Sequence, residues 1–208
     1  TAPNRPCNPG NPDMRNTLLA AAILLSNVTA TAADQDGHFG IKGIGASACA
    51  EYVQAAAAGS PLAGRYLGWA NGYLTRLNQT DAQTFDILPW QSTRMLYVLL
   101  GDYCQQHPDK SFGTAVSALT KALQTQRLTR ESGVRQYTND NGSVFLYEEV
   151  LRLAQKRLNE ATGAGIAVNG NLDDATTEAL EKFQQAHKLQ ASGLPDEPTL
   201  QLLFYPPE

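Results

Sequence analysis

Histidine and cysteine, the residues that most often hold metals or act as nucleophiles, are few in this chain and widely separated. The three histidines, His38, His107 and His187, lack the spacing that a metal site requires. The sequence has no H-E-x-x-H zinc motif and no G-x-S-x-G turn, which would present a nucleophilic serine. We therefore predict that the chain binds no metal or cofactor and has no catalytic residue.

The cysteines are expected to have a structural role. Cys7 precedes a predicted export signal, which leaves Cys49 and Cys104 in the exported chain. An even number of cysteines in an exported protein is typical of disulfide bonding. We predict a Cys49–Cys104 bridge, which would stabilise the fold by roughly 4 kcal/mol in a chain-entropy estimate. Two buried free thiols are the alternative.

Export is predicted from residues 14–32. Met14-Arg15 precedes the apolar run Leu18–Leu25, and the small-residue site Ala30-Thr31-Ala32 follows it. A basic start, a short apolar run and an A-x-A site are typical of a cleaved secretory signal peptide. The run is too short to cross about 30 Å of hydrocarbon, so we expect no stable membrane anchor. We interpret residues 1–13 as a non-native extension upstream of the true start.

The composition favours a folded protein that binds neither nucleic acid nor an anionic membrane surface. Of the 208 residues, 42% are hydrophobic and 17% are charged, and the formal net charge is −4. Low charge with ordinary apolar content is not typical of a disordered chain. A nucleic-acid-binding domain normally has a basic face, and a protein held on anionic lipid has a basic cluster.

Residues 33–125 are predicted to form a small all-α domain. Apolar side chains recur every three or four residues in four segments, which begin near Cys49, Leu62, Leu96 and Phe112. The predicted bridge would join the first of these helices to the end of the third. Tyr66, Trp69 and Tyr73 form a stripe at helical spacing, which is more typical of a core than of a sugar-stacking platform, the alternative.

This region resembles a known family of small proteins. The early cysteine, the G-x-x-x-G-Y-L sequence of residues 68–74 and the Tyr103-Cys104-x-x-His107-Pro108 sequence are similar to HdeA-type proteins. The resemblance implies a helical periplasmic domain with one disulfide. It also implies a chaperone or an interaction domain rather than an enzyme.

Residues 126–145 are predicted to be a linker to a second domain. The segment is polar, and its Asn141-Gly142 pair is a turn signal. Its Glu131-Ser132 pair resembles the Glu-Ser pair of lytic transglycosylases. We prefer a solvated linker, because the chain has no room for the catalytic fold that would surround such a glutamate.

A short internal repeat marks the second domain, residues 146–205. The pattern G-x-x-D-x-x-T-x-x-x-L occurs twice, and each copy predicts a turn, a capped helix start and a buried leucine. Glycine permits the tight turn, and aspartate accepts hydrogen bonds from the free N–H groups that begin a helix. The residues are Gly170, Asp173, Thr176 and Leu180 in the first copy, and Gly193, Asp196, Thr199 and Leu203 in the second.

The second domain resembles the peptidoglycan-binding domain 1 family. That family's pattern is followed by Leu151-x-x-Ala154-Gln155-x-x-Leu158-Asn159, Asn169-Gly170, Thr176, Ala179-Leu180, Phe183-Gln184 and the second copy of the repeat. The sequence departs from the pattern at Ala154, Asn169 and Asp174-Ala175. The resemblance implies a three-helix module that holds proteins on peptidoglycan. The fold class is therefore predicted to be all-α, with a disulfide-bonded bundle followed by this module.

Most residues of the pattern are expected to specify helices rather than to touch a ligand. Phe183, Leu180 and Leu203 are predicted to be core residues, and Asp173 and Asp196 to be helix caps. The candidate ligand contacts are polar residues near the turns, namely Asn169, Asn171, Thr177, Gln184 and Gln185.

These observations predict a non-catalytic cell-envelope protein, periplasmic or secreted and associated with the bacterial cell wall. It would bind peptidoglycan through the second domain and present the first domain to another envelope protein. A wall-remodelling enzyme or its accessory is one alternative. A wall-tethered chaperone is the other, because of the HdeA-type resemblance.

Overall fold

The computed structural model describes residues 39–206. The predicted extension at 1–13 and signal peptide at 14–32 lie outside the described residues. Within the described part there are seven α-helices and one two-stranded sheet, so the prediction of an essentially all-α fold is confirmed. None of the described helices is both long enough and apolar enough to cross a membrane.

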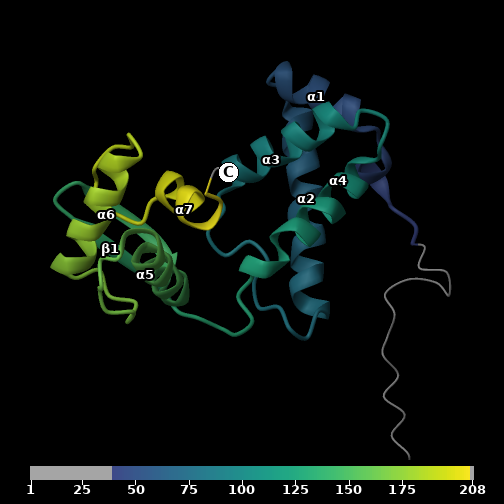
Figure 1. Ribbon diagram of the computed structural model, residues 1–208. Coiled ribbons are helices and arrows are strands. Elements are labelled where there is room, and N and C mark those ends of the chain that lie inside the picture. The colour runs from purple at the N-terminus through teal and green to yellow at the C-terminus, as the bar shows by residue number, and fades with distance from the viewer. Residues whose placement is uncertain (1–38, 207–208) are drawn as a thin grey trace, which may run out of the picture. The chain divides into compact units, whose positions relative to one another are not determined.

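Four helices form the N-terminal bundle, which is shown in blue and teal in Figure 1. Serine side chains cap three of them: the hydroxyl oxygens of Ser60, Ser92 and Ser111 accept hydrogen bonds from backbone N–H groups in the first turn. A 3₁₀ turn precedes the bundle at Gly43–Ala46 and another follows it at Gln124–Gln126. The helices are α1 (Cys49–Ala57), α2 (Pro61–Thr80), α3 (Thr93–Gln106) and α4 (Phe112–Leu123).

Aromatic rings and a disulfide form the centre of the bundle. Tyr52, Tyr66 and Phe112 are fully buried, and their ring centroids lie 4.8–5.3 Å apart. The predicted Cys49–Cys104 bridge is present and joins α1 to α3. Burial raises the pKa of the Tyr52 hydroxyl, which donates a hydrogen bond to the Tyr97 carbonyl.

The aromatic stripe on α2 belongs to this core, as the spacing predicts. Tyr66 is buried, and Trp69 and Tyr73 pack against the core as partly buried side chains. The Trp69 indole N–H donates to the Lys42 carbonyl at 2.9 Å, and its ring stacks on Tyr73. The stripe is therefore occupied by internal packing rather than free to stack on a sugar.

A β-hairpin occupies most of the segment that we expected to be a linker. Strand β1 (Val134–Asn139) pairs antiparallel with β2 (Gly142–Tyr147), and Asn139 lies opposite Gly142. The turn is tight because the Asn139 side chain accepts a hydrogen bond from the Asn141 N–H, and Gly142 takes a φ of 141°. The Asn-Gly turn signal was therefore part of a hairpin.

Three helices follow the hairpin and form the C-terminal module, green to yellow in Figure 1. They are α5 (Glu148–Thr162), α6 (Asp174–Ala186) and α7 (Glu197–Phe204). The side chains of Asp173 and Asp196 cap α6 and α7, as the repeat predicts. Hydrogen bonds from Thr176 hold the pKa of the Asp173 carboxyl below its usual value.

The bundle and the module share buried side chains. Two side chains of the bundle belong to the same buried cluster as the core leucines of the module. They are Met95, in the first turn of α3, and Trp90, in the segment before α3. The Trp90 ring stacks on Phe204 with centroids 5.5 Å apart. The Glu197 carboxylate also accepts hydrogen bonds from the N–H and hydroxyl of Ser92, at the start of α3. The domain boundary at 126–145 stays a prediction.

Removal of the disulfide should destabilise the bundle. We expect the paired substitution Cys49→Ser and Cys104→Ser to lower the free energy of unfolding by roughly 2–5 kcal/mol, because the unfolded chain loses its cross-link. Urea denaturation followed by circular dichroism measures this loss. Unchanged stability, together with two titratable thiols in the parent protein, would contradict the bridge.

Candidate functional site

A buried glutamine, Gln155, holds the first turn of the module together. Its side-chain oxygen accepts hydrogen bonds from the N–H groups of Asn169 and Gly170, both at 2.9 Å. Its amide nitrogen donates to the Asn171 carbonyl at 2.9 Å and to the Thr176 hydroxyl at 3.1 Å. Gln155 is 1% exposed, so these hydrogen bonds replace water entirely.

A second buried glutamine, Gln184, holds the second turn of the module together through its side-chain hydrogen bonds. Its side-chain oxygen accepts from the Gly193 N–H at 2.8 Å, and its amide nitrogen donates to the Leu194 carbonyl at 2.9 Å and to the Thr199 hydroxyl at 2.8 Å. The Ser192 hydroxyl is a further acceptor. Gln184 is fully buried, so its role is structural, and this corrects the expectation that it contacts a ligand.

The two glutamines explain the internal repeat. Each one joins the glycine of a G-x-x-D-x-x-T copy to the threonine of the same copy, across the N-cap aspartate. Both glycines have positive φ and close neighbours: a Cβ at Gly170 would lie 2.8 Å from Glu148 Cγ, and one at Gly193 would lie 2.6 Å from Thr177 Cγ2. The repeated residues therefore specify the turns.

The other candidate contacts lie in two places: Asn169 and Asn171 share the first turn, where the Asn169 side chain accepts a hydrogen bond from the Asn171 N–H at 2.8 Å, and the remaining two lie on α6. Asn169 and Asn171 are exposed on the first turn, where the Asn171 side chain accepts a hydrogen bond from Arg135 at 3.1 Å. Thr177 is half-buried against Gly193, and Gln185 is exposed on α6. None of the five candidates lines either of the two hollows described next, so the structure does not bring them together as one site.

The first hollow is a groove between the end of α5, the loop after it and α6. It has a volume of about 520 Å³. Its apolar lining is formed by Ile166, Phe183 and five alanines, whose short side chains leave the space open: Ala161, Ala164, Ala175, Ala179 and Ala186. We call it the alanine groove.

Polar side chains stand at the edge of the alanine groove. Lys182 and Glu178 pair at 2.6 Å on the exposed side of α6, and the hydrogen bond from Lys182 lowers the pKa of the Glu178 carboxyl. The His187 ring lies 4.3 Å from the Phe183 ring, centroid to centroid. An apolar floor with a few polar groups at its rim is the usual form of a ligand site.

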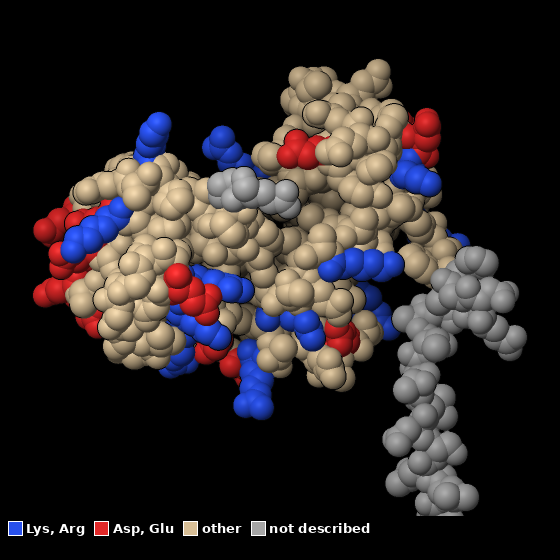
Figure 2. Space-filling view, in the orientation of Figure 1, with Lys and Arg blue, Asp and Glu red and all other residues tan. Residues whose placement is uncertain are grey.

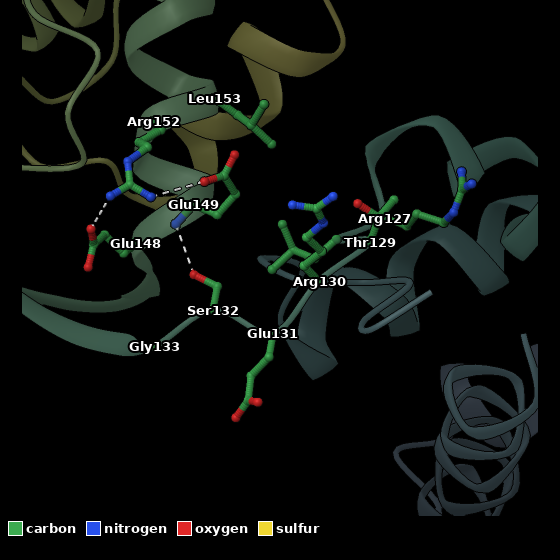
Figure 3. Close-up of a pocket in the computed structure, with 11 residues that line it drawn as sticks. Arg127, Thr129, Arg130, Glu131, Ser132, Gly133, Glu148, Glu149, Arg152 and Leu153 are labelled. Carbon is green, nitrogen blue, oxygen red and sulfur yellow. Dashed lines mark hydrogen bonds and ion pairs between the residues drawn. The ribbon is translucent and has the colours of Figure 1, made fainter. Parts of the chain in front are cut away.

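The second hollow lies beside the start of α5 and is shown in Figure 3. It has a volume of about 510 Å³, and segment 127–133 faces α5 across it. We call it the charged pocket, because Arg127, Arg130 and Arg152 line it together with Glu131, Glu148 and Glu149.

The Glu131-Ser132 pair has a structural explanation within this pocket. The Ser132 hydroxyl accepts a hydrogen bond from the Glu149 N–H at 3.1 Å, so it satisfies a free donor in the first turn of α5. Glu131 is exposed, and Figure 3 shows its carboxylate directed away from α5.

Charges of both signs occur on the face of the molecule shown in Figure 2. In Figure 2, basic and acidic side chains are interspersed on the face shown, with no continuous basic stripe. In the described part of the chain, no three histidine, cysteine, aspartate or glutamate side chains lie close enough together to hold a metal ion.

Comparison with known proteins identifies the module. Residues 148–203 match the family described as "Putative peptidoglycan binding domain". The match begins at the first residue of α5 and ends within α7, so it covers both glutamine-held turns. The resemblance drawn from the sequence is thereby confirmed for the module. Neither a curated protein nor a solved structure matches the chain, and the HdeA-type likeness of the bundle stays a prediction.

The two neighbouring glutamines of α6 give a direct test of the buried hydrogen bonds. We expect Gln184→Ala to lower the free energy of unfolding by roughly 3 kcal/mol, because it leaves a cavity and buried N–H and hydroxyl groups without partners. Gln185→Ala, at an exposed position, should change it by less than about 0.5 kcal/mol. Thermal and urea unfolding of the two variants measures the difference, and equal stabilities would contradict the assignment.

Proposed function

We propose that this chain is an exported, non-catalytic cell-envelope protein that attaches to peptidoglycan through its C-terminal module. The family match over residues 148–203 carries the proposal, because it coincides with a complete three-helix module. Both turns of the module keep their buried glutamine and its partners. Association with the cell wall follows from binding to peptidoglycan.

The alanine groove is the contact that we propose for the polymer. Peptidoglycan carries many small methyl-bearing groups, on its N-acetyl sugars and on the alanines of its peptides. Such groups fit a groove walled by alanine side chains, with Phe183 and Ile166 as larger apolar surfaces. The polar groups of Lys182, Glu178 and His187 at the edge are suited to orient a hydrated polymer.

A binding role without catalysis has support from three observations. The two cysteines of the described chain are joined to each other, so neither is a free thiol nucleophile. The Glu131 carboxylate is directed away from α5, and the neighbouring Ser132 hydroxyl is used by the helix start. The sequence also lacks the zinc-protease and serine-elbow motifs.

Export is supported by the disulfide, because such bridges persist in oxidising compartments outside the cytosol. The signal-like pattern at residues 14–32 agrees with this location. We propose that the N-terminal bundle then presents its surface to another envelope protein, as a domain held close to the wall by the module that shares its core.

The proposed groove can be tested by filling it in the otherwise intact protein. We expect Ala186→Trp and Ala175→Trp to weaken binding to purified peptidoglycan sacculi by roughly tenfold or more, because each exposed position lines the groove and the indole would occupy it. Cosedimentation of the chain from residue 33 onward measures the affinity. The bundle and the module are kept together in this assay because Trp90 and Met95 contribute to the module's core.

Ala122→Trp is the matched control, because Ala122 is exposed on α4 in the bundle. It should bind sacculi like the parent. If the parent itself does not sediment with sacculi, the proposed function is wrong. If all three tryptophan variants bind equally, the groove is not the contact. A falling turbidity of the sacculi during the assay would instead indicate a hydrolase.

A further inference from the structure

The charged pocket has walls that are fixed in advance. On the α5 side, the Glu148 N–H donates to the Gly133 carbonyl at 2.9 Å and the Glu149 N–H donates to the Ser132 hydroxyl. On the other side, Leu128 forms an isolated bridge with Asp86. Segment 127–133 is therefore tied to both neighbours, and the hollow between them is part of the fold.

Four of the six charged side chains that line the pocket already have partners in the fold. Arg152 forms ion pairs with both Glu148 and Glu149. Arg127 donates to two backbone carbonyls, those of Gln83 and Gln124, and Figure 3 shows its guanidinium directed away from α5. These pairs hold the carboxylates of α5 at the pocket wall.

Arg130 is different. Between residues 39 and 206 the structure gives its guanidinium no hydrogen bond or ion pair, and Figure 3 shows it extending from segment 127–133 toward the Glu149 side of the pocket. A cation on one wall thus faces a carboxylate pair on the other. A hollow of about 510 Å³ between them is large enough for a small polar ligand.

We propose that the charged pocket binds a zwitterionic group of the peptidoglycan stem peptide, with the ligand carboxylate on Arg130 and its ammonium group on Glu149. Guanidinium and carboxylate form the stronger, charge-assisted hydrogen bonds. The glycan strand offers neutral hydroxyl and acetamide groups, whereas stem peptides carry free carboxylates and ammonium groups. This proposal rests on the proposed function and names the part of the polymer that the pocket selects.

The pocket and the alanine groove open on different sides of α5. Leu153 lines the pocket and Thr162 lines the groove, and nine positions correspond to two and a half helical turns. The two hollows are therefore separate contacts. Peptidoglycan repeats its peptides regularly. Once one hollow has bound the polymer, the effective concentration of the polymer at the other hollow is high, so two weak contacts together give a stronger overall affinity.

The test compares two soluble probes on the chain from residue 33 onward. One probe is a disaccharide muropeptide whose stem peptide retains a free ammonium group and a free carboxylate, and the other is the same disaccharide without peptide. We expect Arg130→Gln to weaken muropeptide binding by roughly tenfold in isothermal titration calorimetry, and Arg130→Lys to retain part of the affinity. Disaccharide binding should be the same in all variants.

Arg76→Gln is the matched control, because Arg76 is exposed on α2 in the bundle. If Arg130→Gln and Arg76→Gln bind the muropeptide equally, the pocket proposal is overturned. It is also overturned if the disaccharide binds as tightly as the muropeptide. In both cases the proposed function still stands if the parent protein binds sacculi. If the parent binds neither sacculi nor the muropeptide, both proposals are wrong.

Discussion

A buried primary amide must find a hydrogen-bond partner for each of its polar atoms. The C-terminal module is organised around two such amides, the side chains of two buried glutamines. Gln155 and Gln184 bind the backbone of a turn with one end and the hydroxyl of the following helix with the other. Because an unpaired amide in the core would cost more than the fold gains from it, each turn is restricted to the conformation that offers these partners. Glycine, aspartate and threonine then follow at fixed spacing.

Periodicity predicts the helices and the repeat well, because the decisive interactions are local. Asp173 and Asp196 are caps within their own helix starts, and the leucines of each copy lie on a buried face. The role of Gln184 was missed because its partners lie eight to fifteen residues away. A signal was present: Gln155 follows Leu151 and Gln184 follows Leu180 by four residues, so both lie on the buried stripe.

The β-hairpin at residues 134–147 was not predicted from the sequence, and here too distant contacts are part of the reason. Residues 134–143 are mostly polar, and three of the six residues of β1 are exposed before the first buried one, Tyr137. Tyr137 is buried because it meets the module, where its hydroxyl donates to the Gly170 carbonyl at 3.0 Å. Asn139 likewise donates to the Ser192 carbonyl. The pairing of the two strands is local and its Asn141-Gly142 turn signal is in the sequence, whereas the contacts that Tyr137 and Asn139 make with the module involve distant residues and cannot be read from the segment itself.

The hairpin contacts show what the module needs beyond the residues that define its family. Tyr137 and Asn139 reach the two glutamine-held turns, one each, so the hairpin supports both turns from outside the matched range 148–203. Trp90 and Met95 extend the module's core in the same way from the bundle. The bundle and the module are therefore joined by packed side chains as well as by the connecting chain.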